Sequence, residues 1–217
     1  MSGARLIKPS KMNNFRGYFP SKKCGKMINY ESLLERDYIH ILEFDFEVEH
    51  FVSQPLYIPY VYKGVAHKYY PDFKVVTCDN RVIIVEVKPK KYLNKEENLV
   101  KYEVGRMFCK ENDWEYLVVS EDQIRIGDLQ YNLRKLRRCD YQNVETIINN
   151  TIIQKVREKG SMKIDDLSNE LNKFNKQEIF AHIYYLIYHH QLFTDLVNKK
   201  LSKESIILAN LRGKSNV

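Results

Sequence analysis

The sequence predicts an α/β fold, in which a mixed sheet flanked by helices is followed by a small, mostly helical domain. β-branched and aromatic residues are dense between Val48 and Val87, and the apolar run at 82–85 has the character of a strand buried on both faces. Segments of helical period precede and follow this β-rich stretch. A short polar stretch at 139–144 separates it from three further helical patterns. A chain of 217 residues has room for one large domain, or for one domain and a smaller one.

The first half of the chain alternates helical and β patterns. A helix is predicted where apolar residues recur at helical spacing after Tyr30, with two glutamates near its start, where the helix dipole favours them. Asp79-Asn80 is a turn signal between two β runs, and Pro89 ends the second run. We expect antiparallel strands first and a crossover helix before the last strand. The predicted elements are a helix at 31–43, β-rich sequence at 48–62, strands at 69–76 and 81–87, a helix at 96–110, a strand at 114–119 and a helix at 128–138.

The second half is mostly helical. Three helical patterns, at about 144–158, 163–172 and 176–190, precede a hairpin-like tail. Three short helices with a small β-hairpin are typical of a winged helix, a relative of the helix-turn-helix. The sequence therefore predicts three parts, which are an extended, loosely ordered N-terminal arm at 1–29, an α/β domain at 30–138 and a winged-helix-like domain at 139–217.

The positive charge of the chain is concentrated at its N-terminus. Lys and Arg number 35 against 28 Asp and Glu, a formal net charge of +7. Residues 1–26 contain seven basic side chains and no acidic one, so the remainder is balanced. A basic arm favours a polyanionic partner, and nucleic acid comes first among these.

Several classes of protein do not fit the sequence. The four cysteines lie at least 30 positions apart, which fits neither a zinc site nor a disulfide framework and suggests free thiols in a reducing cytosol. No apolar stretch approaches the ~18 residues of a membrane span, and the basic N-terminus lacks the apolar core of a signal peptide, so we expect a cytoplasmic location. A glycine-rich phosphate loop and a hydrolytic triad are also missing from the sequence.

The informative constellation is Asp72 with Glu86 and Lys88. Asp72 opens one predicted strand, and Glu86 lies 14 positions later on the adjoining strand. Residues i and i+2 of a strand share a face, so Glu86 and Lys88 point the same way. A turn near Asn80 brings Asp72 and Glu86 together in space. An Asp after Pro is commonly a turn residue, and Glu-x-Lys is commonly a solvated pair, but these charges adjoin the most apolar strand, where burial without a purpose is costly.

Two facing carboxylates favour a divalent cation between them. Oxygen ligands select Mg²⁺, for which Mn²⁺ often substitutes, and the carbonyl of Val87 is a further candidate ligand. Such a cation would contact a phosphate oxygen and lower the pKa of a bound water. Lys88 could orient that water or stabilise the charge that develops on the phosphorus group. Glu35, on the helix before the sheet, could complete a second metal position.

These landmarks resemble a known family. The order Pro-Asp…Glu-x-Lys is that of the PD-(D/E)xK nuclease fold, whose sheet is restriction-endonuclease-like, and residues 30–89 resemble the N-terminal domain of the TnsA transposon endonuclease family. The resemblance implies that 30–138 is a nuclease domain, that Glu35, Asp72, Glu86 and Lys88 are its catalytic residues, and that Glu35, Asp72, Glu86 and Val87 hold the metal. The matching motifs are Ser32-Leu33-Leu34-Glu35-Arg36-Asp37, Ser53-Gln54-Pro55-Leu56, Tyr70-Pro71-Asp72-Phe73 and Val85-Glu86-Val87-Lys88-Pro89.

The resemblance also implies a role and partners. TnsA-like subunits cut the 5′ strands at transposon ends, while a separate DDE-type transposase subunit, TnsB, processes the 3′ strands. The C-terminal domain of the family contacts the AAA+ regulator TnsC. Glu103 is a candidate accessory acid, although a helix-surface charge is an equal reading. In the predicted helix at 176–190, no Arg or Lys lies between Gln177 and Gln191, which favours a protein-binding over a DNA-reading winged helix.

Two groups of basic residues are candidate DNA contacts, for which a solvated tail and a solvated helix end are the alternatives. They are Lys22, Lys23 and Lys26 in the arm, and Arg134, Lys135, Arg137 and Arg138 in the helix at 128–138. The first hypothesis for function is a Mg²⁺-dependent DNA endonuclease of a bacterial cut-and-paste transposase. The alternatives are a repair or restriction nuclease of the same fold and a non-catalytic, DNA-bound assembly factor.

Overall fold

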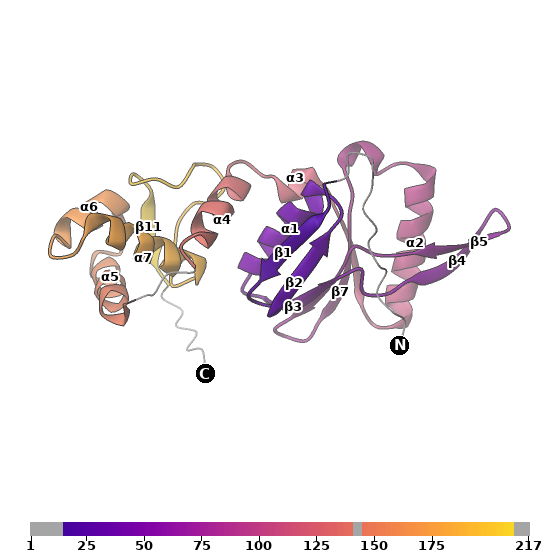
Figure 1. Ribbon diagram of the computed structural model, residues 1–217, viewed down its shortest axis with the longest axis horizontal. Helices are drawn as coiled ribbons and strands as arrows, with labels where there is room; N and C mark the ends of the chain where they lie inside the picture. The colour runs from indigo at the N-terminus through magenta and orange to yellow at the C-terminus, as the bar shows by residue number, and fades with distance from the viewer. Residues whose placement is uncertain (1–14, 141–144, 211–217) are drawn as a thin grey trace. The chain divides into compact units, whose positions relative to one another are not determined.

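The computed structural model describes residues 15–140 and 145–210. The chain divides into two compact units, Met1–Arg125 and Ile126–Val217 (Figure 1). The first unit is α/β and the second is mostly helical, as the sequence predicts. None of the helices within the described ranges is long and apolar enough to span a bilayer.

The first unit is built on a four-stranded mixed sheet with the order β3-β6-β7-β8. Strands β3, β6 and β7 pair antiparallel, while β7 and β8 pair parallel, so the helix between them is a crossover connection. The predicted succession of antiparallel strands followed by a crossover helix is confirmed. The bounds are Val48–Ser53 for β3, Phe73–Thr77 for β6, Val82–Val87 for β7 and Glu115–Val119 for β8.

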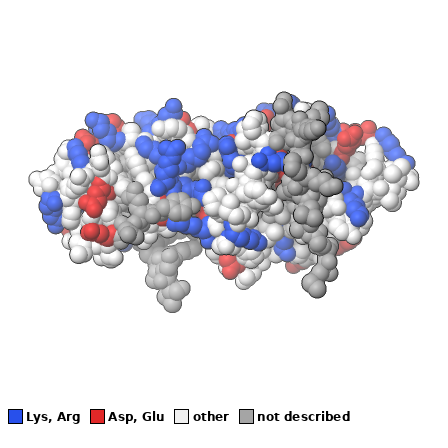
Figure 2. Space-filling model, in the orientation of Figure 1, with Lys and Arg blue, Asp and Glu red and all other residues white. Residues whose placement is uncertain are grey.

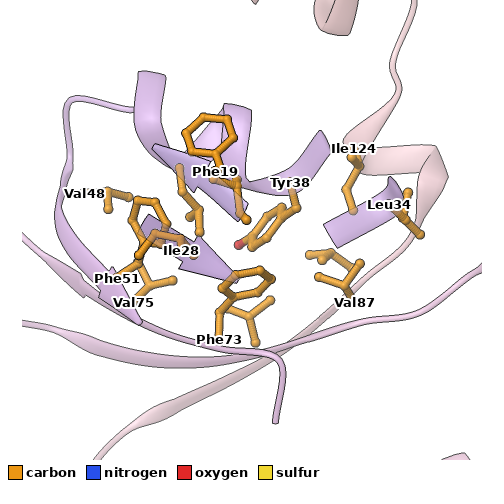
Figure 3. Packing of buried hydrophobic residues seen from close by; sticks show 14 residues of the cluster. Phe19, Ile28, Leu34, Tyr38, Val48, Phe51, Phe73, Val75, Val87 and Ile124 are labelled. Carbon is orange, nitrogen blue, oxygen red and sulfur yellow. The ribbon is translucent and has the colours of Figure 1, made fainter. Parts of the chain in front are cut away.

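The two faces of this sheet have different partners. On one face, Phe73 of β6 pairs in register with Val85 of β7, and both side chains are buried in the main apolar cluster of the unit. Helix α1 (Leu33–Phe44) packs there, and the ring of Tyr38 lies 5.7 Å from the ring of Phe73 (Figure 3). Figure 1 shows α2 (Glu96–Glu111) on the opposite side of the strands from α1. The sheet is therefore covered on both faces.

The expected N-terminal arm is instead partly folded. Its first residues, 1–14, lie outside the described part of the chain, but β1 (Gly17–Ser21) and β2 (Lys26–Tyr30) form an antiparallel hairpin. Phe19 and Ile28 are buried in the same apolar cluster as α1. The carboxylate of Glu43 accepts hydrogen bonds from the hairpin turn, at 2.7 Å from the Lys22 N–H and 2.6 Å from the Ser21 hydroxyl. The prediction of a loosely ordered arm is wrong for these residues.

A second, separate ribbon follows β3. Strands β4 (Ile58–Tyr62) and β5 (Val65–Tyr69) pair antiparallel around a tight turn, in which Lys63 and Gly64 both have positive φ angles. The predicted strand at 69–76 is thereby split, because β5 ends at Tyr69 and β6 begins only at Phe73. Between them, Pro71 lacks the N–H that a continuous ladder needs. Two short helical segments complete the unit, η1 at Lys90–Tyr92 and α3 at Glu121–Ile124.

The second unit contains helices and a three-stranded sheet with the order β10-β11-β9. Both strand pairs are antiparallel, and the predicted hairpin-like tail is the pair β10–β11. Gly160, with φ of 77°, is the C-cap of the helix at Thr146–Lys159. The elements are α4 (Leu129–Arg137), α5 (Thr146–Lys159), β9 (Ser161–Lys163), α6 (Ile164–Glu170), α7 (Lys176–Tyr188), β10 (Leu192–Phe193) and β11 (Ile206–Ala209).

Helix α4 belongs to the second unit, whereas the sequence placed it in the first. Its fully buried Asn132 side chain donates to the carbonyls of Leu196 and Lys199, each at 2.8 Å, and accepts from the Leu201 N–H at 2.8 Å. These bonds tie α4 to the segment between β10 and β11. The division of the chain therefore precedes α4, whereas the sequence placed it at 139–144, of which 141–144 lie outside the described residues.

Candidate active site

The face of the sheet that carries α2 brings the predicted acidic residues together. Phe73 and Val85 are paired in register on the α1 face, so the neighbouring positions Asp72 and Glu86 lie opposite each other on the other face. The turn at Asn80, where φ is 65°, closes the hairpin between the two strands. The register therefore places the two carboxylates as the sequence predicts.

The backbone of β3 and the amide after Glu86 fix Asp72. Its carbonyl accepts a hydrogen bond of 2.8 Å from the Gln54 N–H, just past the end of β3. Gln54 has a φ of 45°, which is uncommon for a residue other than glycine and is typical of a position held by its surroundings. One carboxylate oxygen, Oδ2, accepts a 2.7 Å hydrogen bond from the Val87 N–H. The other oxygen of Asp72 therefore stays available on the side of Glu86.

Glu86 is a buried carboxylate with two partners. It is 3% exposed, the lowest value among the acidic residues of this site. Its Oε1 lies 2.7 Å from the ammonium of Lys88, and its Oε2 accepts a 2.8 Å hydrogen bond from the hydroxyl of Tyr69. The shared strand face of Glu86 and Lys88 is thus confirmed as a direct ion pair. A carboxylate offers about four lone-pair directions, so this one retains capacity for a further partner.

Tyr69 connects Glu86 to a second tyrosine. Its hydroxyl lies 2.8 Å from the hydroxyl of Tyr116 on β8. A phenol has one proton, and that of Tyr69 is directed to Glu86, so Tyr116 must donate to Tyr69. The ring of Tyr116 packs against α2 at Gly105, where a Cβ would meet the ring at 2.3 Å. The three groups form a chain of hydrogen bonds that orients the carboxylate of Glu86.

Glu35 approaches from the N-terminal turn of α1. Ser32 is the N-cap, and its hydroxyl accepts from the Glu35 N–H at 3.1 Å. The carboxylate of Glu35 accepts in turn from the Glu31 N–H at 2.7 Å, so cap and carboxylate hold each other in place. The charge of Glu35 acts on Asp72 and that of Lys88 acts on Glu35. Glu35 thus shares the electrostatic environment of the sheet residues.

Repulsion and burial raise the pKa values of two of these acids. Burial raises the pKa of Asp72 well above its usual range, the charges of Glu86 and Glu35 raise it further, and Lys88 opposes them. Burial likewise raises the pKa of Glu35. For Lys88, burial lowers the pKa, but the carboxylates of Glu86 and Asp72 outweigh it and the pKa is raised. Three acids around one cation leave an excess of negative charge that favours a second cation.

The donor set fits a magnesium ion that keeps other ligands. Within residues 15–140 and 145–210, no three His, Cys, Asp or Glu side chains are grouped closely enough to form a metal cluster by themselves. Mg²⁺ is usually bound through one or two carboxylates, with waters and phosphate oxygens completing its shell. Asp72 and Glu86 fit that requirement, while a second metal position at Glu35 stays a prediction.

A surface cleft of about 290 Å³ adjoins the site. It is lined by Glu31 and Ser32, which precede Glu35, and by Pro89, which follows Lys88. Arg125 also lines the cleft, where its guanidinium is paired with the buried Asp37 at 2.8 Å. The cleft is thus lined by sequence neighbours of Glu35 and Lys88, while none of the four predicted catalytic residues lines it.

The other predicted residues lie apart from this centre. Glu103 is exposed on α2 and pairs with Arg106 at 3.1 Å, so its arrangement is that of a helix-surface charge. The ammonium of Lys23 bonds to the carbonyl of Asp45, and burial lowers its pKa. The ammonium of Lys135 bonds to the carbonyl of Leu201 at 2.7 Å. These two lysines stabilise their own units.

The remaining basic candidates lie at the surface of their units. Lys26 and Arg138 are exposed, and the backbone N–H of Lys22 holds the hairpin turn. On the displayed face of the second unit, Lys and Arg side chains gather over α4 and the segment after β10 (Figure 2). Contact of DNA with Lys22, Lys26, Arg134, Arg137 and Arg138 stays a prediction.

The fold and the site together define a class of protein. A mixed sheet with three antiparallel strands and a parallel fourth, carrying Asp opposite Glu-x-Lys, is a restriction-endonuclease-like nuclease fold. Residues 45–121 match the family model described as TnsA-like endonuclease N terminal, so this part of the first unit is similar to the N-terminal domain of TnsA-like endonucleases. The match supports a nuclease role in DNA transposition. No curated protein sequence matches the chain.

The matched region contains Asp72, Glu86 and Lys88 but begins after the end of α1, so the place of Glu35 rests on its geometry. No sequence motif distinguishes Tyr69 and Tyr116 from the other tyrosines of the chain, which number 16 in all. What could have pointed to these two residues is their position. Tyr69 stands three residues before Asp72, and Tyr116 lies on the strand parallel to β7.

Proposed function

We propose that this chain is the Mg²⁺-dependent endonuclease subunit that cuts the 5′ strands at transposon ends within a heteromeric cut-and-paste transposase. The observation that carries the proposal is the buried Glu86 carboxylate, fixed between Lys88 and Tyr69 and facing Asp72. A structural ion pair would not need a second carboxylate at the same point, since that charge is costly to bury. A site that receives a metal ion and a phosphate does need it.

Asp72 and Glu86 would hold the metal ion, with the Val87 carbonyl as a further ligand and Glu35 at a second position. Mn²⁺ should substitute for Mg²⁺, since both take oxygen ligands. A bound ion would supply an acidified water and would offset the charge of the phosphate. The Val87 N–H and the Tyr69 hydroxyl hold the two carboxylates in orientation, so that little reorganisation accompanies binding.

Lys88 supplies the positive charge of the protein itself. Its raised pKa keeps the ammonium protonated at neutral pH, where it can stabilise negative charge that develops on the phosphate oxygens. In the hydrolysis, a water oxygen forms a bond to phosphorus while the bond from phosphorus to the 3′ oxygen breaks. The 3′ oxygen takes up a proton, which leaves a 3′-hydroxyl and a 5′-phosphate.

The second unit suits a protein partner. The order α5-β9-α6-α7-β10-β11 supports the winged-helix prediction. In such a domain α7 would be the recognition helix, yet much of it is buried and Lys176 at its start pairs with Asp165 at 3.2 Å. The segment between β10 and β11 is bonded to α4 through Asn132. We therefore propose that this unit contacts the TnsC-like AAA+ regulator, and that a TnsB-like DDE transposase cuts the 3′ strands.

The test is strand-resolved cleavage of a labelled duplex with the element's end sequence, in Mg²⁺, with and without the transposase partner. Asp72→Asn is the inactive control, because the amide oxygen can still accept from the Val87 N–H. We expect 5′-strand nicking that needs the partner and is lost in the variant. Cleavage of any duplex without the partner would indicate a repair or restriction nuclease. DNA or partner binding without cleavage would indicate an assembly factor.

A further inference from the structure

Tyr102 on α2 carries a buried hydroxyl that has no hydrogen-bond partner within residues 15–140 and 145–210. The residue is 4% exposed, and its hydroxyl is fully shielded from solvent. A buried phenol normally finds a partner, because leaving its polar group unpaired is costly. The two nearby tyrosines of the site, Tyr69 and Tyr116, are both paired. Tyr102 is therefore the exception that requires an explanation.

The position of Tyr102 directs it to the candidate site. Gly105, three residues further along α2, packs against the ring of Tyr116 on the sheet face that carries Glu86. Residues i and i+3 share a helix face, so Tyr102 faces the same surface. The charges of Lys88, Glu86 and Asp72 all act on its hydroxyl. The unpaired group thus lies beside the acidic centre and its lysine.

Among the described residues, no acceptor lies within hydrogen-bond distance of this hydroxyl. The two oxygens of Glu86 take Lys88 and Tyr69, and one oxygen of Asp72 takes the Val87 N–H. Lys88 has only donors. Tyr102 and Lys88 are therefore two donors beside each other, and a phosphate group, whose oxygens are acceptors, suits both at once.

We propose that the Tyr102 hydroxyl is a substrate contact that donates a hydrogen bond to a non-bridging oxygen of the scissile phosphate. This inference rests on the proposed nuclease function and adds a neutral donor to Lys88 in the recognition of the phosphate. The cost of the unpaired hydroxyl in the free protein is recovered when the DNA binds. Binding thus makes the contact without first breaking another one.

The test is Tyr102→Phe, which removes the hydroxyl and keeps the ring. In the free protein, loss of an unpaired buried group should leave the melting temperature unchanged or raise it. Cleavage of the labelled end duplex with the transposase partner should slow roughly tenfold to a hundredfold. Affinity for the same duplex, measured by fluorescence anisotropy with Ca²⁺ in place of Mg²⁺, should weaken about twofold to tenfold.

Two further variants make the result specific. Tyr69→Phe removes a paired hydroxyl, so it should lower the melting temperature as well as cleavage. Tyr18→Phe alters an exposed tyrosine of β1 and should change neither. A stability loss in Tyr102→Phe would show that the hydroxyl binds a structural water, which would overturn the proposal.

The inference and the proposed function fail in different ways. Equal cleavage and equal DNA affinity of wild type and Tyr102→Phe would refute the contact and leave the nuclease intact. Weakened DNA binding by Tyr102→Phe, in a wild type that never cleaves, would support the contact and refute the nuclease. A wild type that does not bind the duplex would refute both.

Discussion

Replacement of the acidic Asp72 and replacement of the cationic Lys88 should change the stability of the protein in opposite directions, although we expect both to abolish cleavage. Asp72→Asn eliminates a carboxylate whose pKa burial and the charges of Glu86 and Glu35 raise. It keeps an oxygen that can accept from the Val87 N–H. Lys88→Ala instead removes the cation from Glu86, whose side chain is 4% exposed.

The magnitudes follow from burial. Loss of one partner of a buried ion pair typically costs about 3–5 kcal/mol. Lys88 is 23% exposed, so water can reach its side of the pair, and the cost should lie near about 3 kcal/mol. For a domain of this size that lowers the melting temperature by roughly 10 °C. Asp72→Asn relieves repulsion at a functional site. Such a stabilising change commonly raises the free energy of unfolding by about 0.5–2 kcal/mol, which raises the melting temperature by a few degrees.

Differential scanning calorimetry of the full chain in a chelator measures both shifts, and the strand-resolved cleavage assay measures activity. Lys74→Ala is the matched control for the loss of a lysine. Lys74 lies on β6, two residues after Asp72 and on the same face of the sheet, and its ammonium lies 4.1 Å from the Trp114 ring centroid. We expect a smaller loss there, because no buried carboxylate is left behind. A lowered melting temperature for Asp72→Asn, or a raised one for Lys88→Ala, would refute the electrostatic argument.

Three further predictions concern other parts of the structure. Gly105→Ala should lower stability and cleavage, because its Cβ would displace the Tyr116 ring; a more stable variant in circular dichroism melts would contradict this. The stability of metal-free protein should fall as the pH rises from about 4 through the raised pKa of Asp72, since the folded state holds that proton more tightly, and Asp72→Asn should flatten the slope in denaturant titrations. Lys135→Met should destabilise the second unit by roughly 1–3 kcal/mol without a specific loss of DNA affinity, whereas Arg138→Ala should weaken DNA binding and leave melting unchanged.

The acidic residues of the site could be predicted because they depend on local geometry. Alternation along a strand puts Glu86 and Lys88 on one face, and a hairpin turn at Asn80 sets the register that brings in Asp72. The tyrosine chain depends on contacts of another kind. Tyr69 ends the separate β4–β5 ribbon and Tyr116 lies on β8, so their meeting requires the tertiary placement of both.

The hairpin at 17–30 was not predicted from the sequence, for a similar reason. Its turn contains Lys22, Lys23 and Gly25, which read as part of a basic tail when only the sequence is considered. The group that holds the turn is the carboxylate of Glu43, near the end of α1. A carboxylate so distant in sequence leaves no local pattern, and tertiary packing therefore decides the structure of this segment.

Contacts within the folded units also decide which basic residues are good candidates for DNA binding. The sequence counts Lys23 and Lys135 as DNA contacts, but each ammonium bonds to a backbone carbonyl of its own unit. Such an ammonium keeps its charge and two further donors. The bond to the carbonyl restrains its position, however, so we expect it to add less to the salt dependence of DNA binding than an exposed basic side chain does. Net charge therefore overstates the DNA-binding surface, and exposed residues such as Lys26 and Arg138 are the ones whose replacement should reduce that salt dependence.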